Sequence, residues 1–150
     1  MPVAIRFHEK GGPEVLRAEQ VAVGAPGPGH VRLRQTAVGV NYIDTYHRTG
    51  LYPLPLPSGV GMEAAGVVEE VGPDVKGLAA GDRVTYCSGV SPGSYATARI
   101  APAERLVKLP VDITDRQAAG MMLKGLTVQY LVRRTCRVKA GDTVLWHAAA

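Results

Sequence analysis

Side chains suited to chemistry gather in one short segment, from Asn41 to Tyr52. Asn41 supplies an amide donor, and Tyr46 and Tyr52 supply phenol donors whose ring faces can stack on a flat molecule. Arg48 adds a charge that is permanent at physiological pH. Such groups stabilise negative charge that develops on oxygen. The segment therefore predicts a site that holds a flat molecule and donates hydrogen bonds to its oxygen atoms.

Two residues of this segment allow more than one interpretation. If residues 43–48 form a helical turn, Asp44 and Arg48 stand four positions apart and can pair. The pair then belongs to the site, or it is a surface salt bridge with no role there. Tyr42 likewise either packs in a core or faces the site.

The chain offers little for a metal or a disulfide framework. Its four histidines lack the spacing of metal ligands, and Cys87 and Cys136 are too few and too far apart for a zinc knuckle or paired disulfides. We interpret Cys87 as structural and expect a reducing compartment. The carboxylate of Glu63 either stabilises the fold or belongs to the site.

Composition favours a folded globular protein. The 150 residues carry a net charge of +4, with 46% hydrophobic and 20% charged residues, which indicates one domain or one domain plus part of another. Apolar stretches end well short of the roughly 18 residues that a membrane span needs. The first residues lack the apolar run of a secretory signal. The densest basic run, near Arg133, is typical of a solvated helix end. A nucleic-acid binder would show a clustered stripe of Lys and Arg, so the sequence argues against that function.

Glycine and proline separate a series of short strands. Alternating or apolar stretches rich in Val, Ile and Thr predict strands at residues 31–40, 64–71, 82–86 and 94–100, with a weaker candidate at 105–109. Gly66 inside the second strand predicts a bulge or a close backbone approach. Short strands with turns between them indicate an all-β barrel or sandwich.

The pattern becomes helical toward the C-terminus. Asp112 or Thr114 can cap a helix, and a second helical segment at 127–134 follows Gly125. The apolar run at 143–147 is typical of a buried parallel strand. Because such a strand needs neighbours and none follows, we expect one nearly complete β domain and the first part of a second, in an N-terminal fragment of a longer protein.

Several motifs together resemble one family, the quinone oxidoreductase (zeta-crystallin-like) branch of the medium-chain dehydrogenase/reductase superfamily. Their order and spacing carry the resemblance along the whole chain. They are FHEKGGPEVL at 7–16, GVNYIDTY at 39–46, RTGLYP at 48–53, GMEAAG at 61–66, GDRV at 81–84 and KGLT at 124–127.

The resemblance implies a mainly β fold with some α structure. A GroES-like β-barrel catalytic domain spans residues 1–123, and residues 124–150 begin a Rossmann domain that is truncated before its glycine-rich loop. That loop binds the pyrophosphate of NADPH in the family. We therefore expect the chain by itself to bind NADPH weakly and to be inactive.

The resemblance also implies roles for individual residues. The catalytic residues are Asn41, Asp44, Arg48 and Tyr52, and the cofactor-binding residues are Asn41, Tyr42, Ile43, Asp44, Thr45, Tyr46, Thr127 and Tyr130. Zinc-dependent members of the superfamily have Cys and His where this chain has Asn41 and Met62, so no metal is expected. Lys124 is a weak candidate for a phosphate contact.

The implied function is that of a cytoplasmic, homodimeric NADPH:quinone oxidoreductase with a quinone as substrate and no membrane partner. Two alternatives stay open. One is a related zinc-independent reductase of enones or enoyl thioesters. The other is a non-catalytic role, as a crystallin-like or RNA-binding protein, although the chain has no basic patch interleaved with aromatic residues.

Overall fold

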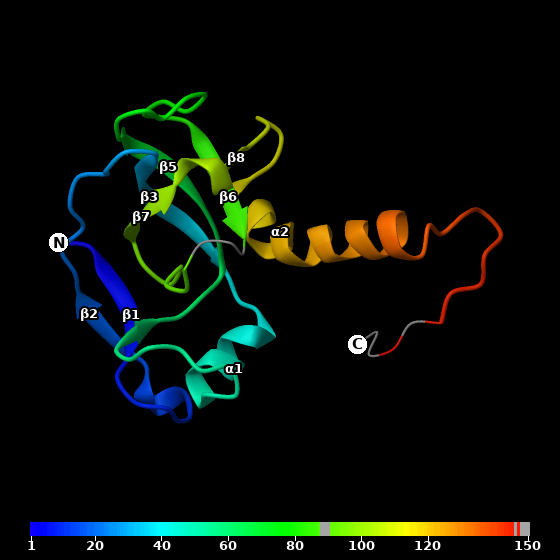
Figure 1. The fold of residues 1–150 in the computed structure, drawn as a ribbon, viewed down its shortest axis with the longest axis horizontal. Coiled ribbons are helices and arrows are strands. Elements are labelled where there is room, and N and C mark those ends of the chain that lie inside the picture. The colour runs from blue at the N-terminus through cyan, green and yellow to red at the C-terminus, as the bar shows by residue number, and fades with distance from the viewer. Residues whose placement is uncertain (88–90, 146, 148–150) are drawn as a thin grey trace.

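Two antiparallel sheets form a barrel from which one long helix extends (Figure 1). The computed structural model describes residues 1–87, 91–145 and 147. The smaller sheet has the order β2-β1-β4 and the larger the order β7-β3-β5-β6-β8. The strands are β1 (Val3–Phe7), β2 (Arg17–Gln20), β3 (His30–Gly39), β4 (Ser58–Gly59), β5 (Glu63–Val71), β6 (Arg83–Cys87), β7 (Ala98–Pro102) and β8 (Val107–Lys108).

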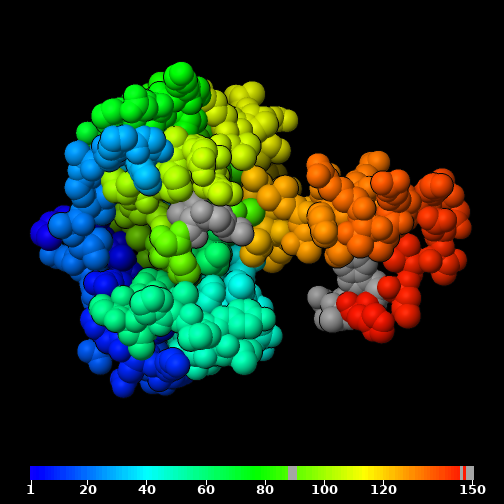
Figure 2. All heavy atoms as spheres, viewed as in Figure 1, coloured from blue at the N-terminus to red at the C-terminus, as the bar shows by residue number. Residues whose placement is uncertain are grey.

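Helices are few, and two of them bear on the site. Helix α1 (Tyr42–Thr49) follows β3 directly, and helix α2 (Asp115–Gln129) leaves the barrel and continues into a π-helix, η3 (Tyr130–Thr135). Short 3-10 helices lie at η1 (Pro13–Val15) and η2 (Ala103–Arg105). In Figure 2 the outer part of α2 and the segment after it extend from the barrel as an arm. None of the helices among the described residues is long and apolar enough to cross a membrane.

The main core fills the space inside the larger sheet. Alternate residues of β3 turn inward, so Val31 and Leu33 are fully buried beside Val68 and Val84 of the neighbouring strands. A second cluster around Phe7 and Val60 closes the end near the smaller sheet. Burial of this aliphatic surface is the main stabilising contribution to the barrel.

A third, smaller cluster attaches α2 to the barrel. Ala118 and Ala119 pack on Ala65 of β5, and small side chains allow this close approach. The backbone N–H of Gln117 donates to the Thr114 hydroxyl, so Thr114 is the N-cap of the helix. Of the two predicted caps, Asp112 and Thr114, the structure uses Thr114. The first turns of α2 are thus held firmly at the end of β5.

The predicted fold class is confirmed, and so are most strands. Those predicted at 31–40, 64–71 and 82–86 match β3, β5 and β6 to within one residue at each end. A side chain at Gly66 would overlap the backbone oxygen of Arg34, which confirms the predicted close approach. The strand predicted at 94–100 begins only at Ala98, because the carbonyl oxygens of Ser94 and Ala96 accept hydrogen bonds from the Gln35 side chain.

Two predictions near the C-terminus are wrong. Gly125 does not separate two helical segments, because α2 runs through it at a cost of only about 1 kcal/mol for a helical glycine. Residues 143–145 form no strand, since no other strand lies beside them in the described part of the chain, and Leu145 is 81% exposed. Trp146 lies outside the described residues. The expected domain boundary between residues 123 and 124 falls within α2, and the division stays a prediction.

The end of β3 requires glycine. A methyl group at Gly39 would overlap the Ala119 carbonyl oxygen and lie 2.5 Å from Glu63 Oε2. We predict that Gly39→Ala lowers the free energy of unfolding by about 1–3 kcal/mol in urea titrations, because helix backbone and a buried carboxylate cannot move aside. The matched control is Gly120→Ala, which meets open space within α2 and should raise stability by about 0.5–1 kcal/mol. Equal effects of the two variants would contradict this packing.

Asp115 links the start of α2 to the sheet and makes stability depend on pH. The hydrogen bond from Thr36 is the main cause that lowers the pKa of this carboxyl, and Arg83 lowers it further. Because the pKa is lower in the folded state, the ionised carboxyl stabilises the fold at pH values above its ordinary pKa near 4. That stabilisation is lost as the pH falls through the lowered pKa. We predict that Asp115→Asn flattens the loss of stability below about pH 4, whereas Asp112→Asn, at an exposed position, does not. An unchanged acid transition in Asp115→Asn would refute this linkage.

Candidate active site

Asn41 sits at the junction of β3 and α1. It is the N-cap of α1, and its backbone N–H donates to Asp44 Oδ2 at 2.9 Å, as in the first half of a capping box. The residue is only 6% exposed. The turn between strand and helix therefore fixes where the Asn41 side chain begins.

Two charged groups then fix the orientation of the Asn41 amide. Its Nδ2 donates to Glu63 Oε2 at 2.8 Å, and its Oδ1 accepts from Lys124 Nζ at 2.8 Å. A carboxylate can only accept and an ammonium can only donate, so one amide orientation satisfies both. We call Asn41, Glu63, Lys124 and the Leu123 backbone N–H the Asn41 cluster.

Glu63 is the centre of this cluster. It begins β5, where it pairs with Gly39 on one side and Cys87 on the other, and it is fully buried. Its second oxygen accepts the Leu123 N–H at 2.7 Å from the middle of α2, and Lys124 Nζ lies 4.0 Å from its first oxygen. Two N–H donors and a nearby ammonium compensate the buried charge.

Asp44, on the buried side of α1, supports the Asn41 cluster. Its Oδ2 accepts the Tyr95 hydroxyl at 2.9 Å as well as the Asn41 N–H, and the residue is 5% exposed. Burial, and then the contact with Asp44, raises the pKa of Tyr95 far above its usual range. Tyr95 therefore stays a neutral phenol that donates to Asp44 throughout the physiological pH range.

The pair expected between Asp44 and Arg48 does not form. Arg48 Nη1 instead donates to the carbonyl oxygen of Gly11 at 2.8 Å, which ties α1 to the loop after β1. The carboxylate of Asp44 turns the other way, because Asn41 and Tyr95 supply its donors. The structure thus separates Arg48 from the Asn41 cluster and joins Asp44 to it.

Three tyrosines form a group along α1 and the turn after it. The ring of Tyr46 lies between those of Tyr42 and Tyr52, with edge-to-face contacts at centroid distances of 5.2 and 5.3 Å. Tyr42 is 75% exposed and Tyr52 is 50% exposed, so the core interpretation of Tyr42 is wrong. Thr45 serves the helix itself through its hydroxyl, which donates to the Tyr42 carbonyl oxygen, and Ile43 is half-buried.

A hollow on α2 lies next to the Asn41 cluster. It encloses about 340 Å³ and is lined by Cys87, Leu123, Leu126, Thr127 and Tyr130. We call it the α2 hollow. Its walls are mainly apolar, and burial, together with the charge of Glu63, raises the pKa of the Cys87 thiol. Two predicted residues, Thr127 and Tyr130, thus line the same hollow, and Lys124 lies in the same helix as Thr127.

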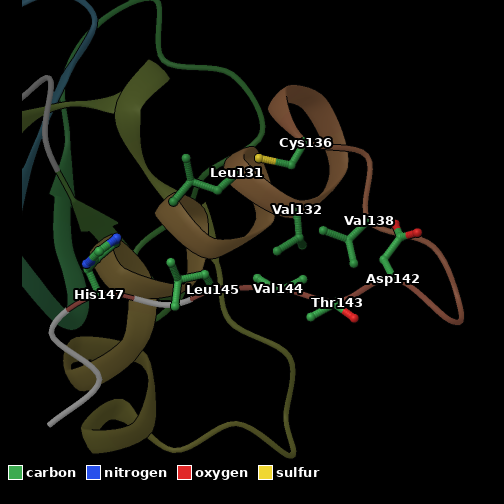
Figure 3. A pocket seen from close by; sticks show the side chains of 9 residues that line it. All are labelled: Leu131, Val132, Cys136, Val138, Asp142, Thr143, Val144, Leu145 and His147. Carbon is green, nitrogen blue, oxygen red and sulfur yellow. The ribbon is translucent and has the colours of Figure 1, made fainter.

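A larger cavity lies farther along the arm. It has a volume of about 660 Å³, and aliphatic side chains of η3, such as Leu131 and Val132, face Val144 and Leu145 across it (Figure 3). None of the predicted site residues lines it. A fixed amide and a lysine ammonium meet at the Asn41 cluster, and the exposed Tyr42 follows Asn41 directly in the chain, so we place the candidate active site there.

Sequence reasoning missed parts of this site. Lys124 was only a weak candidate for a phosphate contact, and its contact with Asn41 from within α2 was not predicted. Its position after an apolar stretch, Met121 to Leu123, was the available signal. Tyr95 gave no signal, since 51 residues separate it from Asp44.

The fold and site agree with what the chain is similar to. The chain belongs to the alcohol dehydrogenase GroES-like domain family, whose model matches residues 27–111. It is 53% identical to a 2-haloacrylate reductase from a Burkholderia species and 50% identical to a quinone oxidoreductase from Pseudomonas aeruginosa, each covering all of this chain and 46% of the relative. The chain thus spans about half the length of the curated relatives it matches.

Solved structures give the same result. A quinone oxidoreductase from Escherichia coli, solved in complex with NADPH, superposes with a TM-score of 0.86 at 47% identity, over 89% of this chain and 41% of that one. The resemblance to the quinone oxidoreductase branch, drawn from the motifs, is confirmed.

The Tyr95 contact leads to a prediction about stability. Tyr95→Phe removes a donor from a buried carboxylate, so we expect the free energy of unfolding to fall by about 1–3 kcal/mol in urea titrations. Tyr130→Phe is the matched control, because this tyrosine is 58% exposed, and it should change stability by less than about 0.5 kcal/mol. A neutral Tyr95→Phe would show that Asp44 does not depend on this hydroxyl.

Proposed function

We propose that this chain forms the barrel side of the active site in an NADPH-dependent quinone reductase. The observation that carries the proposal is the Asn41 amide, held between Lys124 and Glu63, in a chain 50% identical to a quinone oxidoreductase. Because the chain spans 46% of that relative, the activity is proposed for the protein that contains these residues.

Reduction of a quinone places negative charge on its oxygen atoms, and this chain can stabilise that charge. Asn41 Nδ2 carries two N–H groups, and one is donated to Glu63. We propose that the other donates to a quinone oxygen. Tyr52 supplies a further phenol donor at the other end of the tyrosine group, and the exposed rings of Tyr42 and Tyr52 offer faces for a flat substrate.

The residues present suit a nicotinamide cofactor. Residues 41–46 offer an amide, backbone groups and aromatic faces, while Thr127 and Tyr130 add hydroxyl groups on the apolar wall of the α2 hollow. An uncharged ring with a carboxamide needs this mixture of apolar surface and a few polar groups. When bound, NADPH supplies the hydride. We propose that these two sets of residues bind it from opposite sides and orient its ring.

The remaining predicted roles follow from the contacts. We propose that Asp44 acts by positioning Asn41, and that Arg48 acts by fixing α1 through its bond to the Gly11 carbonyl oxygen. We also propose that the reaction needs no zinc. The Lys124 ammonium lies 2.8 Å from Asn41 Oδ1 and 4.0 Å from Glu63 Oε2, so a metal cation between those oxygens would be repelled. The family resemblance supports a cytoplasmic homodimer.

A second candidate is the reduction of activated alkenes. The relative with 53% identity is a 2-haloacrylate reductase, and its named substrate also gathers negative charge on oxygen when a hydride adds to the double bond. The same Asn41 donor would serve both reactions. Substrate preference therefore has to be measured.

We expect the protein that contains these residues to reduce quinones with NADPH in a panel that also contains enones and 2-haloacrylates. Asn41→Ala should lower kcat by about 100-fold or more, because it removes a fixed donor to the developing charge. Gln20→Ala, on the exposed face of β2, is the control and should keep full activity. Turnover of alkenes alone would favour the second candidate, and turnover of none of these compounds would reject both.

A further inference from the structure

Lys124 has a bonding capacity that the Asn41 cluster does not use. Its Nζ donates to Asn41 Oδ1 at 2.8 Å and to the Val40 carbonyl oxygen at 3.3 Å. An ammonium has three N–H bonds, and the third has no acceptor among the described residues. The side chain is 57% exposed, so this third N–H faces space that solvent or a ligand can reach.

Two donors that have no acceptor in the described part of the chain therefore lie close together. One is the third N–H of Lys124, and the other is the second N–H of Asn41, whose first is donated to Glu63. Both groups are fixed by their remaining contacts, since Lys124 is tied to Asn41 and Asn41 to Glu63. Donors fixed before a ligand arrives stabilise an oxyanion without further ordering cost.

We infer that Lys124 is a further catalytic residue, which binds the oxyanion formed by hydride addition and gives it a proton. The inference rests on the proposed reductase function. Hydride transfer from NADPH to a quinone adds two electrons and one proton and leaves a hydroquinone monoanion. The Nζ–H bond of Lys124 then breaks as the O–H bond of the product forms, which leaves a neutral amine.

The exposure of Lys124 allows the catalytic cycle to close. The neutral amine can take a proton from bulk water through its solvent-facing side, which restores the ammonium. An alkene substrate follows the same balance, because hydride addition leaves an enolate that needs one proton. No oxidant or reductant other than NADPH and the substrate takes part.

Three other donors, Tyr95, Arg48 and Thr127, already donate to groups of the chain itself. The Tyr95 hydroxyl is bonded to Asp44 beneath α1, and Arg48 donates to the Gly11 carbonyl oxygen. The Thr127 hydroxyl donates to the Leu123 carbonyl oxygen within α2. Lys124 combines a mobile proton, contact with Asn41 and access to solvent.

The first test measures anion binding and needs no turnover. The probe is 4-nitrophenol, whose phenolate form has its own absorption band, titrated into the protein that contains these residues. We expect the protein to favour bound phenolate, Lys124→Arg to keep this preference, and Lys124→Met to weaken phenolate binding by about tenfold or more through loss of a charged donor. Lys139→Met, at an exposed position on the arm, is the control. Unchanged phenolate binding in Lys124→Met would overturn the inference.

The second test separates proton donation from a structural role. It compares a quinone whose hydroquinone is a very weak acid with a halogenated quinone whose hydroquinone is a much stronger acid, so that its monoanion is a stable product that needs no proton donor. Lys124→Arg should lower kcat for the first by about 100-fold and leave the second within a factor of about three, whereas Lys124→Met, which also removes the charge that binds the oxyanion, should lower kcat for both. Arginine keeps the charge but does not release a proton at neutral pH. Equal losses on both quinones in Lys124→Arg would overturn proton donation.

The two tests keep the proposals apart. If the unmodified protein reduces neither quinone nor alkene, the proposed function fails, while phenolate binding still decides whether Lys124 forms an anion site. If reduction proceeds and the Lys124 variants are unaffected, the inference fails alone. Urea titration of each variant identifies loss of folding, and Lys124→Arg preserves the charge beside Asn41 if Lys124→Met is unstable.

Discussion

A fully buried carboxylate sets the architecture of this site. Removal of a carboxylate from water costs several kcal/mol unless donors replace the lost hydration. Glu63 meets this requirement with an amide from the β3–α1 junction, a backbone N–H from α2 and an ammonium 4.0 Å away. The β3–α1 junction and α2, which together supply these three groups, have to meet at the first residue of β5, so the charge fixes their relative placement.

This requirement explains features that seem unrelated in the sequence. Gly39 carries no side chain because α2 and the carboxylate occupy the space beside it. Ala118 and Ala119 are small, so α2 can approach close enough for its Leu123 N–H to reach Glu63. Asp44 and Tyr95 then hold Asn41 from its backbone side, and one of its two amide N–H groups has no acceptor among the residues that the structure describes. Close packing of small residues and the polar contacts of Asp44 and Tyr95 thus together fix the positions of Glu63 and Asn41.

The elements that the sequence predicted correctly are those controlled by a local pattern of residues. Alternation along β3 and the Thr114 cap of α2 are local signals, and both elements form as expected. Motifs identified the family, and residue types identified Asn41 as a donor. The features that could not be predicted depend on partners far away in the sequence. The spacing allowed Arg48 to pair with Asp44, but Arg48 donates to the Gly11 carbonyl oxygen and Asp44 accepts from Tyr95. Residues 143–145 have strand-like composition without a neighbouring strand.

The central claim is that Glu63 and Asn41 act together, and a double-mutant cycle tests it most directly. The free energies of unfolding of Asn41→Ala, Glu63→Gln, the double variant and the unmodified chain give the coupling between the two side chains. A hydrogen bond to a buried charge predicts a coupling of about 1.5–3 kcal/mol. A coupling below about 0.5 kcal/mol, the range of independent sites, would contradict the account.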